Sequence, residues 1–229
     1  MISSNLDLLN ELEFVSRGGQ KLEKALNFFN VSPKDKICID CGASTGGFTD
    51  CLLKKGAKLV YAVDVGYGQL AWTLRTDDRV VVMERTNIRY VTPDMLDKAP
   101  ELAVIDVSFI SLAIVLPVVR KLLTDTCQAI CLIKPQFEAG RGKVGKKGVV
   151  RDPETHKEVL DAFIENAKKA GFRVDSITYS PVKGPKGNIE YLGLLSSTGE
   201  NPENSGEPHT IIDTKKIVAD SHKELVTDH

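Results

Sequence analysis

The feature that most constrains this chain is a series of short, wholly apolar segments separated by stretches with helical periodicity. These segments show no alternation of polar and apolar residues, as in Leu-Ala-Val-Ile at 102–105. Strands of this kind are buried on both faces, which is typical of a parallel sheet covered by helices. The sequence therefore predicts a doubly wound α/β fold with a mostly parallel sheet.

The apolar runs and the periodic stretches place the elements of this fold. Strands are expected at 37–40, 59–64, 80–83, 102–106 and 129–133, and helices at 16–29, 46–55, 69–75, 112–123 and 153–170. Two more strands, 173–179 and 189–195, follow without an intervening helix. Because strands joined by a short connection pair antiparallel, they should form a hairpin that completes a seven-stranded sheet.

Composition divides the chain into three parts. We expect residues 1–15 to be a short leader, 16–195 to be the folded domain, and 196–229 to be an acidic, disordered tail. The tail carries seven acidic and three basic side chains, and 211–225 is its helical candidate. We expect a cytoplasmic protein without a membrane anchor, because the sequence shows neither a secretion signal nor an apolar run of about 20 residues.

The cysteines do not predict a metal site. An odd number, five, in a chain without a secretion signal is typical of reduced thiols. Cys38 and Cys41 have the C-x-x-C spacing, but residues three apart on a strand point to opposite faces. No second pair follows at the spacing of a zinc site.

A glycine-rich segment, Asp40-Cys-Gly-Ala-Ser-Thr-Gly-Gly-Phe48, follows the first expected strand and opens a helix. Glycines let the backbone turn tightly and approach a ligand closely, and the helix start offers free N–H groups. The acid before the first glycine favours the sulfonium of S-adenosylmethionine over the pyrophosphate of NAD, and the glycine spacing departs from G-x-G-x-x-G. NAD, or a tight turn without any ligand, is the alternative.

Other candidate cofactor-binding residues lie at the ends of later strands. Asp64 ends the second strand at the separation expected of an acid that binds a ribose diol. Residues 84–87 follow the third strand, where an adenine would lie. The candidate set is Asp40, Gly42, Ala43, Ser44, Thr45, Gly46, Gly47, Asp64, Glu84, Asn87 and Asp106.

Two ionisable residues end expected parallel strands, where doubly wound sheets bind their ligands. Asp106 closes Leu-Ala-Val-Ile, and Lys134 closes Ile-Cys-Leu-Ile. Partial desolvation lowers the pKa of a lysine, which would let Lys134 act as a general base or orient an alkoxide. Asp106 would hold this lysine, and Glu190 in the final hairpin would complete the charge balance. A structural salt bridge is the alternative for each residue.

Several longer motifs resemble the TlyA, or haemolysin A, family. They are Ser16-Arg-Gly-Gly-Gln-Lys-Leu-Glu-Lys-Ala-Leu26, Asp40 through Phe48, Asp106-Val-Ser-Phe-Ile-Ser111, Ile133-Lys-Pro-Gln-Phe-Glu138 and Gly184-Pro-Lys-Gly-Asn-Ile-Glu190. The resemblance spans residues 14–195. That family is similar to the FtsJ-like ribose methyltransferases, which have the Rossmann-like class I methyltransferase fold and use a Lys-Asp-Lys-Glu tetrad.

The resemblance implies a function and a catalytic set. It implies S-adenosylmethionine-dependent methylation of ribose 2′-hydroxyls on cytidines of ribosomal RNA, with ribosomal RNA or ribosomal subunits as partners. It places the tetrad on Lys21, Asp106, Lys134 and Glu190, where Lys21 comes from the resemblance alone. Members of the family carry an S4-type RNA-binding domain ahead of this segment. Only fifteen residues precede Ser16, so that domain is expected to be missing.

Basic residues gather in two glycine-rich segments near the expected catalytic edge. Lysine and arginine interspersed with flexible glycine suit contact with an RNA backbone, although a solvated charge run is the alternative. The candidate RNA-binding residues are Arg17, Arg141, Lys143, Lys146, Lys147, Arg151, Lys183 and Lys186.

Three other functions stay open. A base N-methyltransferase would use Asp106-Val-Ser-Phe109 to grip an exocyclic amine, but the prolines of such a loop are absent. A membrane-active haemolysin would need a strongly amphipathic segment, which the sequence does not show. A catalytically idle RNA-binding or ribosome-associated module is the third alternative.

Overall fold

A seven-stranded sheet runs through the part of the chain that this computed structural model describes, residues 13–197 and 211–226. From β3 to β5 all neighbouring strands are parallel, and β7 pairs antiparallel with both β5 and β6. The predicted doubly wound, mostly parallel seven-stranded sheet is confirmed. The strands are β1 (Ile37–Cys41), β2 (Leu59–Val63), β3 (Val80–Met83), β4 (Leu102–Ile105), β5 (Gln128–Ile133), β6 (Phe172–Tyr179) and β7 (Tyr191–Ser197), in the order β3-β2-β1-β4-β5-β7-β6.

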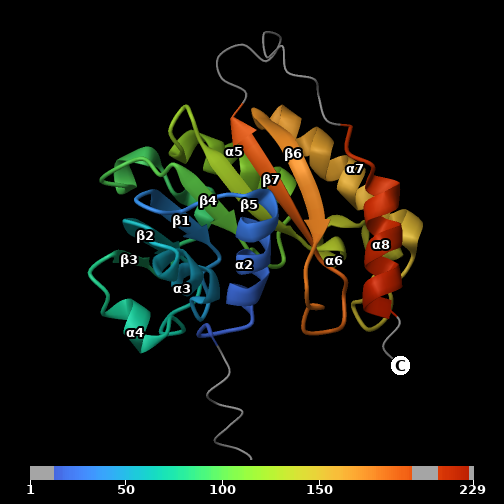
Figure 1. Ribbon diagram of the computed structural model, residues 1–229, viewed down its shortest axis with the longest axis horizontal. Coiled ribbons are helices and arrows are strands. Elements are labelled where there is room, and N and C mark those ends of the chain that lie inside the picture. Colours follow the sequence, from blue (N-terminus) through green and yellow to red (C-terminus); the bar gives the residue numbers. More distant parts are fainter. Residues whose placement is uncertain (1–12, 198–210, 227–229) are drawn as a thin grey trace, which may run out of the picture.

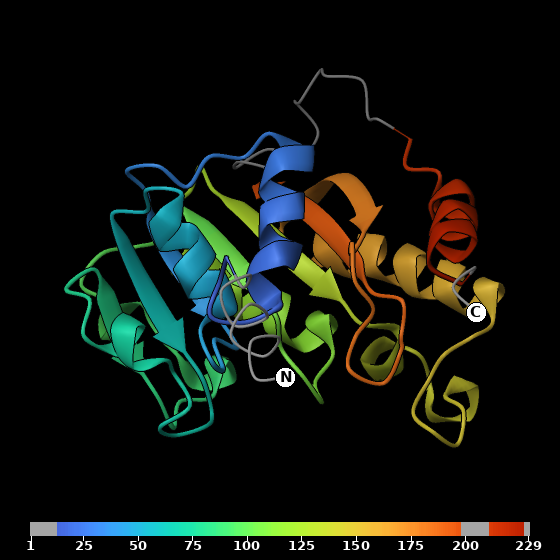
Figure 2. The same ribbon diagram turned by 60° about the horizontal axis from the view of Figure 1, so that its bottom comes forward.

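Helices cover both faces of the sheet (Figure 1, Figure 2). One face carries α2 (Gly18–Phe29), α3 (Gly47–Lys54) and α4 (Trp72–Arg75), and the other carries α5 (Leu112–Leu122), α7 (Pro153–Lys169) and α8 (Thr214–Val226). Alternate residues of one strand enter the two layers: Cys38 packs with α2 and α3, whereas Ile39 packs with α5 and α7. This two-sided burial explains why the strands are apolar throughout.

Four short elements lie in the connections between the longer ones and were not predicted. They are α6 (Pro135–Glu138) and the 3₁₀ turns η1 (Ile88–Tyr90), η2 (Pro93–Met95) and η3 (Arg141–Lys143). Each is a single turn, too short to show helical periodicity in a sequence. Among the described residues, no helix combines the length and the apolar character needed to cross a membrane.

The domain begins earlier than the expected boundary at residue 16. Phe14 is buried in the layer of α2 and α3. It lies directly against Gly19, where a Cβ would stand 2.2 Å from the Phe14 ring. The Val15 N–H also donates to the Asp50 carboxylate of α3 at 2.9 Å. Residues 13–15 are therefore part of the domain, and the rest of the expected leader, 1–12, lies outside the described residues.

The expectation of a disordered tail is wrong for residues 214–226, which form α8, close to the helical candidate 211–225. Val218 is buried in the core layer of α5 and α7. The Thr214 hydroxyl donates to Asp161 of α7 at 2.7 Å. The acidic composition was misleading because one face of this helix still buries apolar surface, which stabilises it on the domain. Residues 198–210 and 227–229 lie outside the described residues.

Candidate active site

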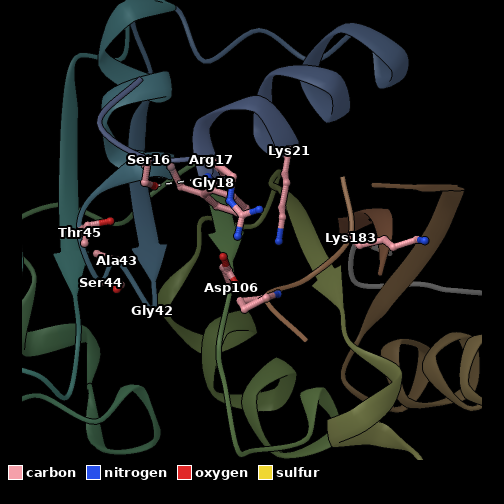
Figure 3. A pocket seen from close by; sticks show the side chains of 13 residues that line it. Ser16, Arg17, Gly18, Lys21, Gly42, Ala43, Ser44, Thr45, Asp106 and Lys183 are labelled. Carbon is pink, nitrogen blue, oxygen red and sulfur yellow. Dashed lines mark hydrogen bonds between the residues drawn. The ribbon is translucent and has the colours of Figure 1, made fainter. Parts of the chain in front are cut away.

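The carboxyl ends of the parallel strands meet at one edge of the sheet, where two cavities open beside the glycine-rich loop. The larger, of about 710 Å³, falls in the size range of small-molecule sites. The smaller, of about 220 Å³, lies between the start of α2 and the glycine-rich loop (Figure 3). The cavities adjoin, because both are lined by Gly42, Ser44 and Asp106.

The glycine-rich loop between β1 and α3 forms the wall shared by the two cavities. Gly42 has φ +93°, and a Cβ there would lie 2.4 Å from the Asp106 carbonyl oxygen. The position therefore requires glycine, since only glycine adopts this backbone without strain and without a clash against the backbone that follows β4. The loop is also tied to β2, because the Ser44 N–H donates to the Asp64 carboxylate at 2.9 Å.

Asp40 lies beneath this loop. Its side chain is fully buried, and one carboxylate oxygen accepts a hydrogen bond from the Thr49 hydroxyl at 2.7 Å. The other oxygen has no hydrogen-bond partner among the described residues. Burial raises the pKa of Asp40 to about 7, although the Thr49 hydrogen bond acts in the opposite direction.

Lys134, which follows β5, pairs with Asp106, which follows β4. Lys134 Nζ lies 2.6 Å from Asp106 Oδ1 and donates to the Ser108 hydroxyl at 3.0 Å. The Lys134 side chain is 11% exposed and that of Asp106 is 23% exposed. Asp106 lines both cavities, and Lys134 lies behind it and lines neither.

Lys21 of α2 pairs with Glu190, which immediately precedes β7. Lys21 Nζ lies 2.6 Å from Glu190 Oε2, and Glu190 is 1% exposed. A Cβ at Gly184 would lie 2.4 Å from Glu190 Oε1, so a glycine there lets the β6–β7 connection close over the carboxylate. In Figure 3, Arg17 and Lys21 extend from the start of α2 toward Asp106, whereas Lys183 points away from them.

The structure thus assembles the four predicted catalytic residues as two ion pairs at one edge of the sheet. Of the predicted cofactor-binding residues, Asp40, Gly46 and Glu84 line neither cavity. The Glu84 carboxylate instead pairs with Arg75 and accepts the Gly68 N–H. The Arg75 guanidinium lowers the pKa of Glu84. The other predicted cofactor-binding residues, Asn87 among them, line one or both cavities.

The predicted RNA-binding segments lie side by side. The Asn188 side chain donates to the Gly148 carbonyl and accepts the Val150 N–H, both at 2.9 Å. This contact joins the segment 145–151 to the β6–β7 connection, and Lys146, Lys147, Arg151 and Lys186 are exposed there. Lys183 and the exposed Arg17 line the smaller cavity.

Lys143 instead forms an ion pair with Glu158. The backbone of residue 141 belongs to η3, and its side chain lies outside the described part of the structure. RNA binding by these eight residues stays a prediction.

Three polar residues near the ion pairs were given no role from the sequence: Ser108 and Gln136 contact the pairs, and Glu138 contacts the start of α5. Ser108, Gln136 and Glu138 lie within the quoted motifs, but their partners are distant in the sequence. The cysteines lie elsewhere: all five are buried and unpaired. Cys38 and Cys41 enter opposite layers of the sheet, as their spacing predicted.

The strand order, with β7 inserted antiparallel between β5 and β6, and the glycine-rich loop beside a cavity define a Rossmann-like methyltransferase architecture. The model of the FtsJ-like methyltransferase family matches residues 14–196. The chain belongs to this family.

Relatives and a solved structure agree with this assignment. The Bacillus subtilis protein YqxC is 56% identical, over 94% of this chain and 76% of its own length. The Mycobacterium tuberculosis 16S/23S rRNA (cytidine-2′-O)-methyltransferase TlyA is 48% identical, over 80% of this chain and 68% of its own length. A solved structure from Streptococcus thermophilus that carries a hemolysin name is 50% identical, with a TM-score of 0.88 over 95% of this chain and 78% of that one.

Proposed function

We propose that this chain transfers a methyl group from S-adenosylmethionine to the ribose 2′-hydroxyl of cytidines in ribosomal RNA. The observation that carries the proposal is the Lys134–Asp106 ion pair, in which Asp106 lines both cavities beside the glycine-rich loop. The name of the Mycobacterium tuberculosis relative supports the nucleic acid, the nucleotide and the reacting hydroxyl.

The residues around the larger cavity fit S-adenosylmethionine. Gly42 lets the glycine-rich loop pack directly against the Asp106 backbone, and this places the loop backbone in the wall of the cavity. Asp64 lines the cavity with a carboxylate that is suited to a ribose diol. When bound, the cofactor supplies a methyl group activated by its sulfonium charge.

Lys134 would act on the attacking hydroxyl. A ribose hydroxyl is a weak nucleophile at neutral pH, and it must lose its proton as its oxygen gains the methyl group. Lys134 is placed to orient this hydroxyl and to receive its proton, while Asp106 and Ser108 hold the lysine. Most of the rate enhancement would come from positioning and from electrostatic assistance within the site.

The exposed basic residues would hold the RNA backbone. Lys146, Lys147, Arg151 and Lys186 lie on the two joined segments beside the ion pairs. Contacts of this kind release counterions, so binding should weaken steeply as salt rises. Arg17 and Lys183 would extend this basic surface to the smaller cavity.

The test is methyl transfer by the purified chain with labelled S-adenosylmethionine and ribosomal subunits. Nuclease digestion and mass spectrometry should identify 2′-O-methylcytidine, which the Lys134→Ala variant should fail to form. A methylated base would indicate a base methyltransferase. Binding to ribosomal RNA without methylation of either ribosomal subunit would indicate an idle binding module.

A further inference from the structure

The short helix α6 contacts three different parts of the site. It follows directly after Lys134, which pairs with Asp106. Two residues on, Gln136 Nε2 donates to Glu190 Oε1 at 3.4 Å. At the end of the turn, Glu138 contacts the start of α5. One turn of helix therefore reaches both ion pairs and the loop that carries Asp106.

Glu138 caps α5 from outside that helix. One of its carboxylate oxygens accepts the Ser111 hydroxyl at 2.7 Å, and the other accepts the Leu112 N–H at 2.8 Å. The Ser111 oxygen itself accepts the Ala113 N–H at 3.1 Å. The first amides of a helix lack partners within the helix, and a carboxylate forms stronger hydrogen bonds to them than a neutral group does.

The loop 106–111 is consequently held at both ends by residues from 134–138. Asp106 and Ser108 contact Lys134 at one end, and Ser111 contacts Glu138 at the other. Between them Phe109 has φ +64° and a side chain that is 90% exposed. A phenylalanine in the left-handed region is strained, and such a conformation persists only where the surroundings impose it.

We propose that Glu138 is a positioning residue for methyl transfer, because it holds the loop 106–111 so that Asp106 and Ser108 stay against Lys134. We call the contact of Glu138 with Ser111 and Leu112 the clamp. This inference rests on the proposed function, since it gives the clamp a role in that reaction. Glu138 lines neither cavity at the strand ends, so it acts through the loop and not on a ligand. Burial raises the pKa of Glu138, in keeping with its enclosed position.

The test compares Glu138→Ala with Glu138→Gln. The alanine removes both acceptors, and displacement of reacting groups by about 1 Å can cost about 100-fold in rate. We therefore expect kcat to fall at least about tenfold, with the Kd for S-adenosylmethionine within about threefold of the original. The glutamine can still accept the Leu112 N–H and donate to the Ser111 oxygen, so it should restore kcat to within about threefold.

Two further variants separate positioning from general damage. Ser111→Ala removes one of the two bonds, and combining it with Glu138→Ala should lower kcat no further than Glu138→Ala alone. It also tests the clamp if Glu138→Ala fails to fold. Glu165→Ala, at an exposed position on α7, is the matched control and should leave kcat unchanged.

Amide hydrogen exchange tests the clamp without any need for activity. Faster exchange confined to residues 106–113 in Glu138→Ala, and absent in Glu138→Gln, would support the proposal. A kcat within twofold of the original in Glu138→Ala would overturn it, as would equal losses in both variants with faster exchange throughout the sheet. If the chain without substitutions shows no methyl transfer, the proposed function is contradicted. Hydrogen exchange in the Glu138 variants would still test the clamp in that case.

Discussion

The two ion pairs of the site differ in what surrounds them, although each joins Nζ to a carboxylate oxygen at 2.6 Å. Glu190 is 1% exposed and lines neither cavity at the strand ends, whereas Asp106 is 23% exposed and lines both. The two lysines are alike, at 10% and 11% exposed, and Lys21 lines the smaller cavity, so the difference lies in the carboxylates. We call Lys21–Glu190 the sealed pair and Lys134–Asp106 the open pair, after their carboxylates; a catalytic role for both lysines stays a prediction.

The two pairs also join different parts of the chain. Asp106 and Lys134 follow neighbouring strands, β4 and β5, so the parallel ladder alone brings them together. Lys21 lies on the first described helix and Glu190 immediately precedes the last strand, so their contact closes the domain. Because Glu190 is the more buried carboxylate, breaking the sealed pair should lower stability most, and breaking the open pair should lower the rate most.

The largest expected effect is the loss of methyl transfer in Lys134→Ala. General acid–base groups contribute about 10²–10⁴ to a rate, so we expect kcat to fall about 1,000-fold. The Kd for S-adenosylmethionine should change little, because Lys134 does not line the larger cavity. The midpoint of thermal unfolding should also change little, because the Asp106 carboxylate left behind is 23% exposed to water. Single-turnover methylation measures the rate, titration calorimetry measures the Kd, and scanning calorimetry measures the unfolding midpoint.

A matched control for this prediction is Lys121→Ala, in the last turn of α5, which should keep full activity. Should Lys134→Ala retain more than about a tenth of the activity, the open pair would not be the catalytic pair and the comparison would lose its basis.

The sealed pair should show its effect in stability. Lys21→Met leaves the Glu190 carboxylate buried without its cation, and breaking a buried pair in this way costs about 3–5 kcal/mol. Adding Glu190→Gln removes the stranded charge and should recover most of that loss. Urea unfolding of the single and double variants gives both values. If the single variant unfolds at the same urea concentration as the original chain, Glu190 is not sealed in solution.

Asp40 shows what burial does to a carboxylate that is held by a hydroxyl and not by a lysine. Its folded-state pKa of about 7 lies above the ordinary value of about 3.9. The folded state therefore binds this proton more tightly. The stabilisation is fully present below about pH 4 and is lost as pH rises through about 7.

The Asp40→Asn variant tests this sign. Its free energy of unfolding, relative to that of the original chain, should rise by about 2 kcal/mol between pH 5 and pH 7. Urea titrations at several pH values measure the difference, with Asp94→Asn as an exposed control. A difference that is flat with pH, or that falls, would mean that Asp40 is ionised throughout and has a partner in solution.

The limits of sequence reasoning are plain in these same residues. Asp106 and Lys134 could be predicted because each ends an apolar run, and the ends of parallel strands share one edge. Lys21 could not be derived from its helix, since its partner lies 169 positions away and only the family resemblance singled it out. Glu138 and Phe14 were missed for a related reason: a single helical turn and a short approach to a helix show no periodicity. Tertiary contacts decide such positions.

The smallest expected effect concerns Ser108, which gives Lys134 a second acceptor at 3.0 Å. Ser108→Ala should lower kcat about fivefold, because one hydrogen bond contributes about 1 kcal/mol while the Asp106 pair remains. Stability should not change measurably, since Ser108 is exposed. Single-turnover rates at several pH values would measure the effect. A loss as large as that of Lys134→Ala would show that the Ser108 hydroxyl, and not Asp106, holds the lysine. The position of Lys134 in the open pair would then depend more on this hydrogen bond than on the ion pair.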